Sequence, residues 1–182
     1  MVTGLTRNYH TALDQITRVL SPAEGHPVFG LSMLVARGRT VFIADTAVNA
    51  TPSSEEVALI AIQSAAKARQ LGHEPRVALV AFSNFGQTMP DRADNVRGAI
   101  SILDTMQVDF EYDGEMNAEV ALDAKLMKRA YPFCRLSDVA NILIMPGLNS
   151  ASVSSNLMQR LGDARVIGPL LIGLPKPAQI VP

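Results

Sequence analysis

Cysteine and tryptophan are almost missing from this chain of 182 residues, which has one cysteine, Cys134, and no tryptophan. A single cysteine excludes an internal disulfide framework and favours a reducing compartment, so we expect a cytoplasmic protein. No run of about 18 consecutive apolar residues is present, so no membrane span is expected. The first residues also lack the apolar core of a signal peptide.

An excess of charge of one sign is lacking as well. Sixteen Lys and Arg residues stand against seventeen Asp and Glu residues, which gives a net charge of −1. This balance supplies no field that would attract nucleic acid or an anionic membrane, and we expect neither as a partner. A ligand with several phosphates would therefore need a local basic pocket.

The apolar residues alternate between strand-like and helical spacing along the chain, in the proportions of an ordinary globular domain. We predict an α/β fold with a mostly parallel sheet flanked by helices, preceded by an N-terminal helix and a β-hairpin. Residues 1–27 would form the helix and a connector, and residues 28–182 one α/β domain. The predicted helices are 5–20, 51–71, 92–105, 118–130 in one or two pieces, and 151–161. The predicted strands are 28–36, 40–44, 76–82, 108–112, 141–145 and a buried strand 166–173.

Polar loops follow four of the predicted strands, at 83–86, 113–117, 146–150 and 173–177. In an open parallel sheet, ligands bind at the carboxyl ends of the strands, and helix N-termini there can hold phosphate or carboxylate. Polar residues at strand ends are also ordinary caps and turns, and for each loop taken alone the two interpretations weigh about equally. The convergence of the loops on one edge is the informative feature.

The familiar catalytic and nucleotide-binding motifs are missing. There is no G-x-G-x-x-G after a strand and no G-x-x-x-x-G-K-[ST]. His10, His26 and His73 are scattered without partners at ligand spacing, so no metal site is expected. Cys134 has no visible histidine partner, which favours packing over a nucleophilic role. The acidic run Asp113-Gly114-Glu115 could hold a general base, but its spacing favours a turn.

Six segments occur in an order and spacing that resemble the phosphate acetyl/butyryl transferase family. They are 42–49 with Pro52, 74–79, 113–116, 140–146, 157–162 and 167–177. Segments 35–40 and 131–136 are most similar to the version of this domain that is fused behind bacterial NADP-dependent malic enzymes. The resemblance covers nearly the whole chain from Val28 onward.

Transferases of this family interconvert acetyl-CoA and phosphate with acetyl phosphate and CoA, in a cleft between two α/β domains. The resemblance implies that this chain is the second half of that fold, a fragment without the first domain and the C-terminal tail. In working transferases, a serine that assists the thiol follows the Lys-Pro pair after four residues. Here Lys176-Pro177 is followed at that distance by Pro182, which offers no acid–base group. We therefore expect no catalytic residue in the fragment.

The resemblance assigns Arg160 to the CoA site and Lys176 to the same cleft, and Asn156 stands where many relatives have a lysine. By position alone, Arg160 is a cation that complements a helix C-terminus. With the loop residues added, the expected contacts to acetyl-CoA are Ser83, Asn84, Asp113, Glu115, Asn149, Ser150, Arg160 and Lys176.

Two functions are compatible with these features. The leading hypothesis is a regulatory and oligomerisation module of a malic enzyme, with acetyl-CoA as effector and a homodimer or higher oligomer as the assembly. The malate-oxidising part, which needs NADP and a divalent metal, would lie outside this chain, and the fragment itself would hold no cofactor. The alternative is a fragment of an active phosphate acetyltransferase.

Overall fold

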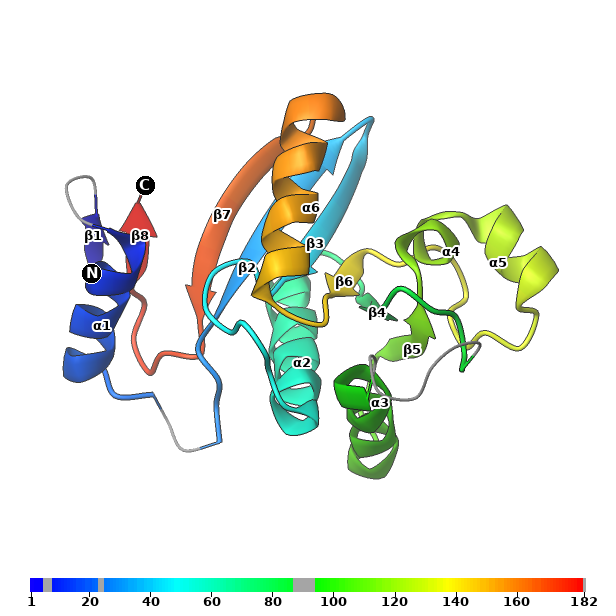
Figure 1. Ribbon diagram of the computed structural model, residues 1–182, viewed down its shortest axis with the longest axis horizontal. Helices are drawn as coiled ribbons and strands as arrows, with labels where there is room; N and C mark the ends of the chain where they lie inside the picture. The colour runs from blue at the N-terminus through cyan, green and yellow to red at the C-terminus, as the bar shows by residue number, and fades with distance from the viewer. Residues whose placement is uncertain (5–7, 23–24, 87–93, 182) are drawn as a thin grey trace.

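The computed structural model describes residues 1–4, 8–22, 25–86 and 94–181. Figure 1 shows a twisted sheet between two layers of helices, with a small unit of two strands and one helix at its side. The α/β architecture with a mostly parallel sheet, predicted from the sequence, is confirmed. None of the described helices is long and apolar enough to cross a bilayer.

The large sheet has six strands in the order β5-β4-β6-β3-β2-β7. Neighbours from β5 to β3 are parallel, and β2 is antiparallel to both β3 and β7. Five of the six strands therefore point the same way, and their carboxyl ends share one edge. The strands are β2 Phe29–Ala36, β3 Arg39–Ala44, β4 Arg76–Val80, β5 Glu111–Met116, β6 Ile142–Ile144 and β7 Arg165–Ile172.

Several of the described helices begin at a residue whose side chain accepts a free N–H group. Ser53 caps the second helix and forms a reciprocal capping box with Glu56. Asn8 caps the first helix through the N–H of His10. The helices are α1 Tyr9–Val19, α2 Ser54–Gln70, α3 Asp94–Met106, α4 Ala118–Leu122, α5 Ala124–Ala130 and α6 Leu148–Leu161. The predicted starts at residues 5 and 92 lie outside the described residues.

The alternation of apolar residues in the strands produces two cores. Phe42 of β3 and Leu79 of β4 point to the face covered by α2 and α3. Their neighbours Ile43 and Ala78 point to the face covered by α4, α5 and α6. Burial on both faces explains why these strands are nearly all apolar in sequence. Gly98 allows α3 to approach α2, because a Cβ there would lie 2.3 Å from the Ser54 hydroxyl oxygen.

The prediction of a strand at 108–112 followed by a turn at 113–117 was wrong. The strand is β5, and the two carboxylates of Asp113 and Glu115 lie within it, 4% and 2% exposed. Charged residues are rarely buried unless they are paired, so the sequence pattern favoured a turn. The pairing comes from Arg135 and Arg97, which belong to other parts of the chain.

The prediction that the strand at 166–173 is buried was also wrong. It forms β7, which lies at the edge of the sheet, and Arg165, Ile167 and Gly168 are exposed. After β7, the chain leaves the large sheet. Strand β8, Gln179–Val181, pairs in parallel with β1, Val2–Gly4, and α1 packs beside them. This small unit (β1, α1 and β8) joins the first and last residues of the described chain (Figure 1).

Candidate functional site

The four polar loops predicted to converge all lie at the carboxyl edge of the large sheet, but they form separate groups. Strands β5 and β4 occupy one end of the sheet and β7 the other. Neighbouring strands lie about 4.8 Å apart, so β5 and β7 are separated by about 24 Å. The expected contacts to acetyl-CoA are therefore divided into a β5 cluster, the face of α6, and the loop after β7.

The β5 cluster is built around the buried carboxylate of Glu115. Ser83 donates its hydroxyl to Oε1 at 2.5 Å, and the Gly86 N–H points to the same oxygen at 3.3 Å. Arg97 on α3 binds both carboxylate oxygens, with Nη2 2.8 Å from Oε1 and Nε bonded to Oε2. Burial alone would raise the pKa of Glu115, but the bonds from Arg97, Ser83 and Gly86 lower it below its usual value. Glu115 is therefore held as a carboxylate.

Asp113 belongs to the same cluster but uses a different partner. Its Oδ2 accepts the backbone N–H of Arg135 at 2.7 Å, and the guanidinium of Arg135 binds Asp104 at 2.6 Å. The Arg135 guanidinium also lies 4.8 Å from the centre of the Tyr112 ring. Asn84 accepts the backbone N–H of Asn117 at 2.8 Å.

Ser83, Asn84, Asp113 and Glu115 are thus brought together as the loops predicted, but their polar atoms bind groups of the protein itself. Buried polar atoms that are satisfied internally favour a structural role. Cys134, next to this cluster, is half-buried. Burial, with a contribution from Asp113, raises the pKa of the Cys134 thiol to about 11, so it is protonated at neutral pH and a poor nucleophile.

A third buried carboxylate, Asp45, was missed as a functional residue. It is 1% exposed and follows β3 at the carboxyl edge. Its oxygens accept the backbone N–H groups of Gly30, Ala47 and Val48 and both the backbone and side-chain N–H groups of Asn49, at 2.5–3.1 Å. Asp45 therefore folds loop 46–49 against the start of β2. Its only signal in the sequence was its place in the segment 42–49.

Loop 46–49 forms one wall of an open cavity of about 290 Å³ between α1, β7 and the N-terminus of α6. The hydroxyl of Tyr9 is buried near it without a hydrogen-bond partner among the described residues. Burial, together with the negative charge of Asp45, raises the pKa of Tyr9 to about 12. We call this space the α6 cavity; it is lined by Tyr9, His10, Thr46, Ala47, Leu148, Asn149, Ser152 and Pro169.

One face of α6 continues from this cavity toward the opposite edge of the sheet. Asn149, Asn156 and Arg160 are all exposed, at successive spacings of seven and four residues, which places them on the same side of the helix. The described structure gives none of these three side chains a hydrogen-bond partner. From Asn149 to Arg160 the helix rises about 16 Å, so Arg160 is far from the β5 cluster and near the start of β7. Ser150 instead donates its hydroxyl to the Gly147 carbonyl at 2.8 Å.

Lys176 lies on the other side of β7. It is exposed in the loop between β7 and β8 and lines a groove shared with Lys67 of α2. The structure therefore does not bring Lys176 to the same face as Arg160. Among the residues that the structure describes, no three His, Cys, Asp or Glu side chains lie close enough to share a metal ion.

The sequence profile described as phosphate acetyl/butaryl transferase matches residues 1–182. This chain belongs to that family. The resemblance inferred from the sequence is therefore confirmed. It extends over the small unit as well as the large sheet.

The most similar relatives include both malic enzymes and transferases. The NADP-dependent malic enzyme of Rhizobium meliloti is 56% identical over 180 residues, which are 99% of this chain and 24% of that protein. The phosphate acetyltransferase of Clostridium acetobutylicum is 36% identical over 138 residues, covering 75% of this chain and 41% of that protein. The chain thus spans about a quarter of the malic enzymes that it matches.

Solved structures of the family have the same fold. The phosphotransacetylase of Streptococcus pyogenes superimposes with a TM-score of 0.94 at 26% identity, covering 100% of this chain and 56% of that chain. The EutD phosphotransacetylase of Staphylococcus aureus superimposes with a TM-score of 0.88 at 24% identity. The α/β sheet and the small unit are therefore one continuous part of the family's fold.

Proposed function

We propose that this chain is an acyl-CoA-binding regulatory module at the C-terminal end of an NADP-dependent malic enzyme. The identity of 56% to a malic enzyme, over a quarter of that protein's length, supports this assignment. Oxidative decarboxylation of malate to pyruvate, with NADP and a divalent metal, would belong to the remainder of the protein. The protein is proposed to act in the cytoplasm.

The observation that carries the proposal is the polar face of α6. Asn149, Asn156 and Arg160 are exposed and have no hydrogen-bond partner among the described residues, in contrast to the internally bonded β5 cluster. A CoA thioester is an elongated ligand with phosphates at one end and the acyl group at the other. Arg160 would pair with a phosphate, and the thioester end would lie toward the α6 cavity, where Asn149 and the N-terminus of α6 offer N–H donors.

Binding on this face would regulate the enzyme through the small unit. The α6 cavity is lined by Tyr9 and His10 of α1 as well as by α6 and β7. A ligand there would contact both the small unit and the large sheet, and would favour one arrangement of the two. A change in malate turnover on binding acetyl-CoA is the proposed consequence.

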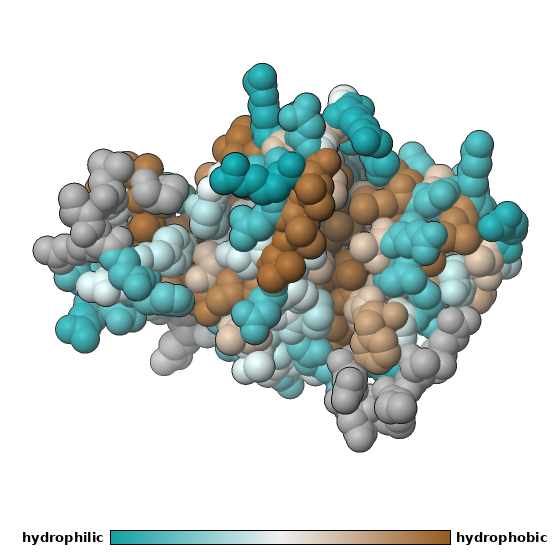
Figure 2. All heavy atoms as spheres, turned by 45° about the horizontal axis from the view of Figure 1, so that its top comes forward, coloured by the Kyte–Doolittle hydropathy of each residue, from teal (hydrophilic) through white to brown (hydrophobic). Residues whose placement is uncertain are grey.

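A second copy of the chain is the proposed partner of the apolar stripe beside this face. Val153, Leu157 and Leu161 are 57%, 53% and 83% exposed and follow one another at intervals of four residues. Figure 2 shows a hydrophobic stripe along α6 between hydrophilic side chains. Contact between two such stripes around a two-fold axis would remove both from water, which supports a homodimer. Sedimentation of Leu157→Glu should show monomers, whereas Val19→Glu, a change at an exposed apolar residue of α1, should leave the dimer intact.

The regulatory proposal is tested by titrating acetyl-CoA into the chain and into the longer protein that carries it. Arg160→Glu should weaken binding and remove the effect of acetyl-CoA on malate turnover. Arg129→Glu is the matched control, because Arg129 is also an exposed arginine in the last turn of a helix. If acetyl-CoA changes neither thermal stability nor malate turnover in the wild type, the proposal is wrong.

Phosphate acetyl transfer is the second candidate, favoured by the similarity to the Clostridium acetobutylicum transferase. Pro182 stands where the family's serine is expected, which weighs against acetyl transfer. This argument rests on the sequence, because Pro182 lies outside the described residues. Formation of acetyl phosphate from acetyl-CoA and phosphate by the longer protein would favour transfer over regulation.

A further inference from the structure

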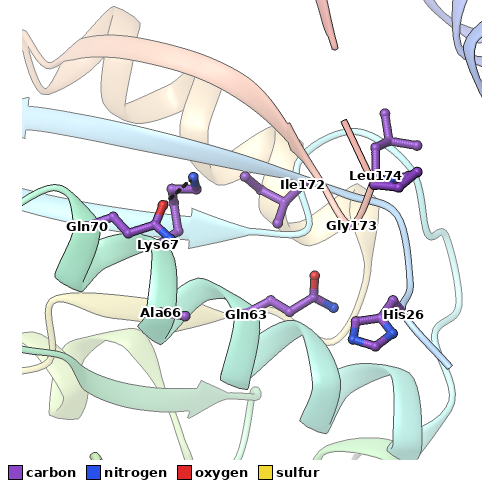
Figure 3. Close-up of a pocket in the computed structure, with 9 residues that line it drawn as sticks. His26, Gln63, Ala66, Lys67, Gln70, Ile172, Gly173 and Leu174 are labelled. Atoms are coloured by element: carbon purple, nitrogen blue, oxygen red, sulfur yellow. Dashed lines mark hydrogen bonds between the residues drawn. The ribbon is translucent and has the colours of Figure 1, made fainter. Parts of the chain in front are cut away.

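A groove on the α2 side of β7 is separate from the face of α6. Two cavities of about 350 and 330 Å³ share Lys67, Ile172, Gly173 and Leu174 and therefore lie side by side. One wall is the C-terminal half of α2, and the other is the end of β7 with the loop that leads to β8 (Figure 3). We call it the α2–β7 groove.

The charged and polar side chains of this groove are donors rather than acids. Lys67, Lys176 and His26 line it, and none of the described residues that line it is Asp or Glu. Lys67 donates one hydrogen bond to Gln70 at 2.7 Å, which leaves two of its three N–H donors for a ligand. The Nε2 of Gln63 is buried without a hydrogen-bond partner in the described part of the chain. A buried amide donor without a partner is costly unless something binds it.

The groove also lies where the small unit joins the large sheet. His26 and Pro27 belong to the connection from α1 to β2, and residues 173–177 to the connection from β7 to β8. The two connections touch: Gly173 has φ +90°, and a Cβ there would lie 2.2 Å from the Pro27 carbonyl oxygen. In Figure 3 the amide of Gln63 extends from α2 toward the side on which His26 lies, and Ile172 and Leu174 form the apolar wall opposite α2.

We propose that the α2–β7 groove is a binding site for a small phosphate ester, distinct from the acyl-CoA face. The ammonium groups of Lys67 and Lys176 would hold the phosphate as point charges, and the amide of Gln63 would donate to a further ligand oxygen. The apolar part of the ligand would lie on Ile172 and Leu174. Because the site includes both connections and α2, occupancy would fix the small unit against the large sheet. This inference does not depend on acyl-CoA binding.

Inorganic pyrophosphate is the simplest probe for this site, with malonate as a dicarboxylate of similar size. Isothermal titration should show pyrophosphate binding to the wild type, and Lys67→Met or Lys176→Met should each weaken it by about tenfold, the loss expected for one charge-assisted bond. Methionine keeps most of the apolar stem, so the fold is preserved. Lys128→Met on α5 and Arg160→Glu on α6 should leave the affinity unchanged.

Hydrogen exchange locates the probe independently of these variants. Pyrophosphate should slow exchange of the amides of Gly173, Leu174 and Lys176 and leave those of α6 unchanged. The proposal is overturned if the wild type does not bind pyrophosphate, if malonate binds and pyrophosphate does not, or if Arg160→Glu abolishes binding while Lys67→Met has no effect.

Discussion

The β5 cluster and the face of α6 are both polar regions bordering the same sheet, but their polar groups are used differently. Glu115 and Asp113 are 2% and 4% exposed and bind Arg97, Ser83 and Arg135 within the protein. Asn149, Asn156 and Arg160 are exposed along one side of a helix, with no hydrogen-bond partner in the described structure. The first region stabilises the fold, and the second is available to a ligand. Polarity at a strand end therefore does not by itself indicate a binding site.

The largest expected effect is on stability at the β5 cluster. Glu115→Ala removes the buried carboxylate that accepts hydrogen bonds from Ser83, Gly86 and Arg97, and should lower the free energy of unfolding by about 2–3 kcal/mol. Urea denaturation measures this loss. Glu119→Ala, at an exposed glutamate of α4, is the control and should change stability by less than about 0.5 kcal/mol. Equal losses of stability in the two variants would show that Glu115 does not stabilise the fold more than an exposed glutamate does.

On α6 we expect a loss of affinity for acetyl-CoA with little change in stability. Arg160→Glu should weaken acetyl-CoA binding at least about tenfold, equivalent to roughly 1.4 kcal/mol, because a phosphate partner becomes a repelling charge. Its unfolding free energy should stay close to that of Arg129→Glu, since both lose a cation at a helix C-terminus. A large loss of stability together with unchanged affinity would make Arg160 a structural residue.

The pH dependence of stability should also distinguish the β5 cluster from the face of α6. The pKa of Glu115 is lowered in the folded protein, so the stability contributed by its ion pair is complete above the usual value of 4.5 and is lost as the pH falls through the lower folded value. Glu115→Gln should flatten the acid limb of the stability curve between these values. Urea midpoints measured at pH 3–6 test this, and an acid limb identical to that of the wild type would contradict it.

The smallest expected effect is a gain in affinity for acetyl-CoA. Asn156 lies midway along the polar face of α6, at a position where the resemblance leads us to expect a lysine in many relatives. Asn156→Lys should strengthen acetyl-CoA binding about threefold to fivefold, the value of one partly exposed charge contact, and the gain should fade in high salt. A control lysine cannot be placed at Asn95, because the side-chain amide of Asn95 donates hydrogen bonds to two backbone carbonyls. Ser154→Lys, on a different side of α6, is the suitable comparison.

Most of the fold could be predicted from the sequence because its strands and helices have clear periodicity. The strands around Phe42, Leu79 and Ile144 are apolar on both faces, and the helix after Ser53 begins with a capping box. The bounds of strand β5 could not be predicted, since burial of Asp113 and Glu115 depends on arginines 22 and 18 residues away. Pairing of β1 with β8 depends on contacts between the two ends of the chain, and three-residue strands carry almost no periodicity.

The candidate site was predicted in part. The loops at 83–84 and 113–115 do meet, but the sequence could not tell that Ser83 bonds to Glu115 rather than to a ligand. Arg160 and Asn149 share a face of α6, which their spacing of eleven residues indicates only once the helix is known to begin at Leu148. The groove at Lys67 could not be foreseen, because α2 and β7 are brought together only by the fold.

Hydrogen exchange with and without acetyl-CoA compares the β5 cluster and the face of α6 in one experiment, on the chain and on the longer protein. We expect slower exchange in α6 and in loop 46–49, with no change in β5. Protection of residues 83–86 and 111–116 with none in α6 would show that the ligand binds at the β5 cluster and that the assignment of the face of α6 is wrong.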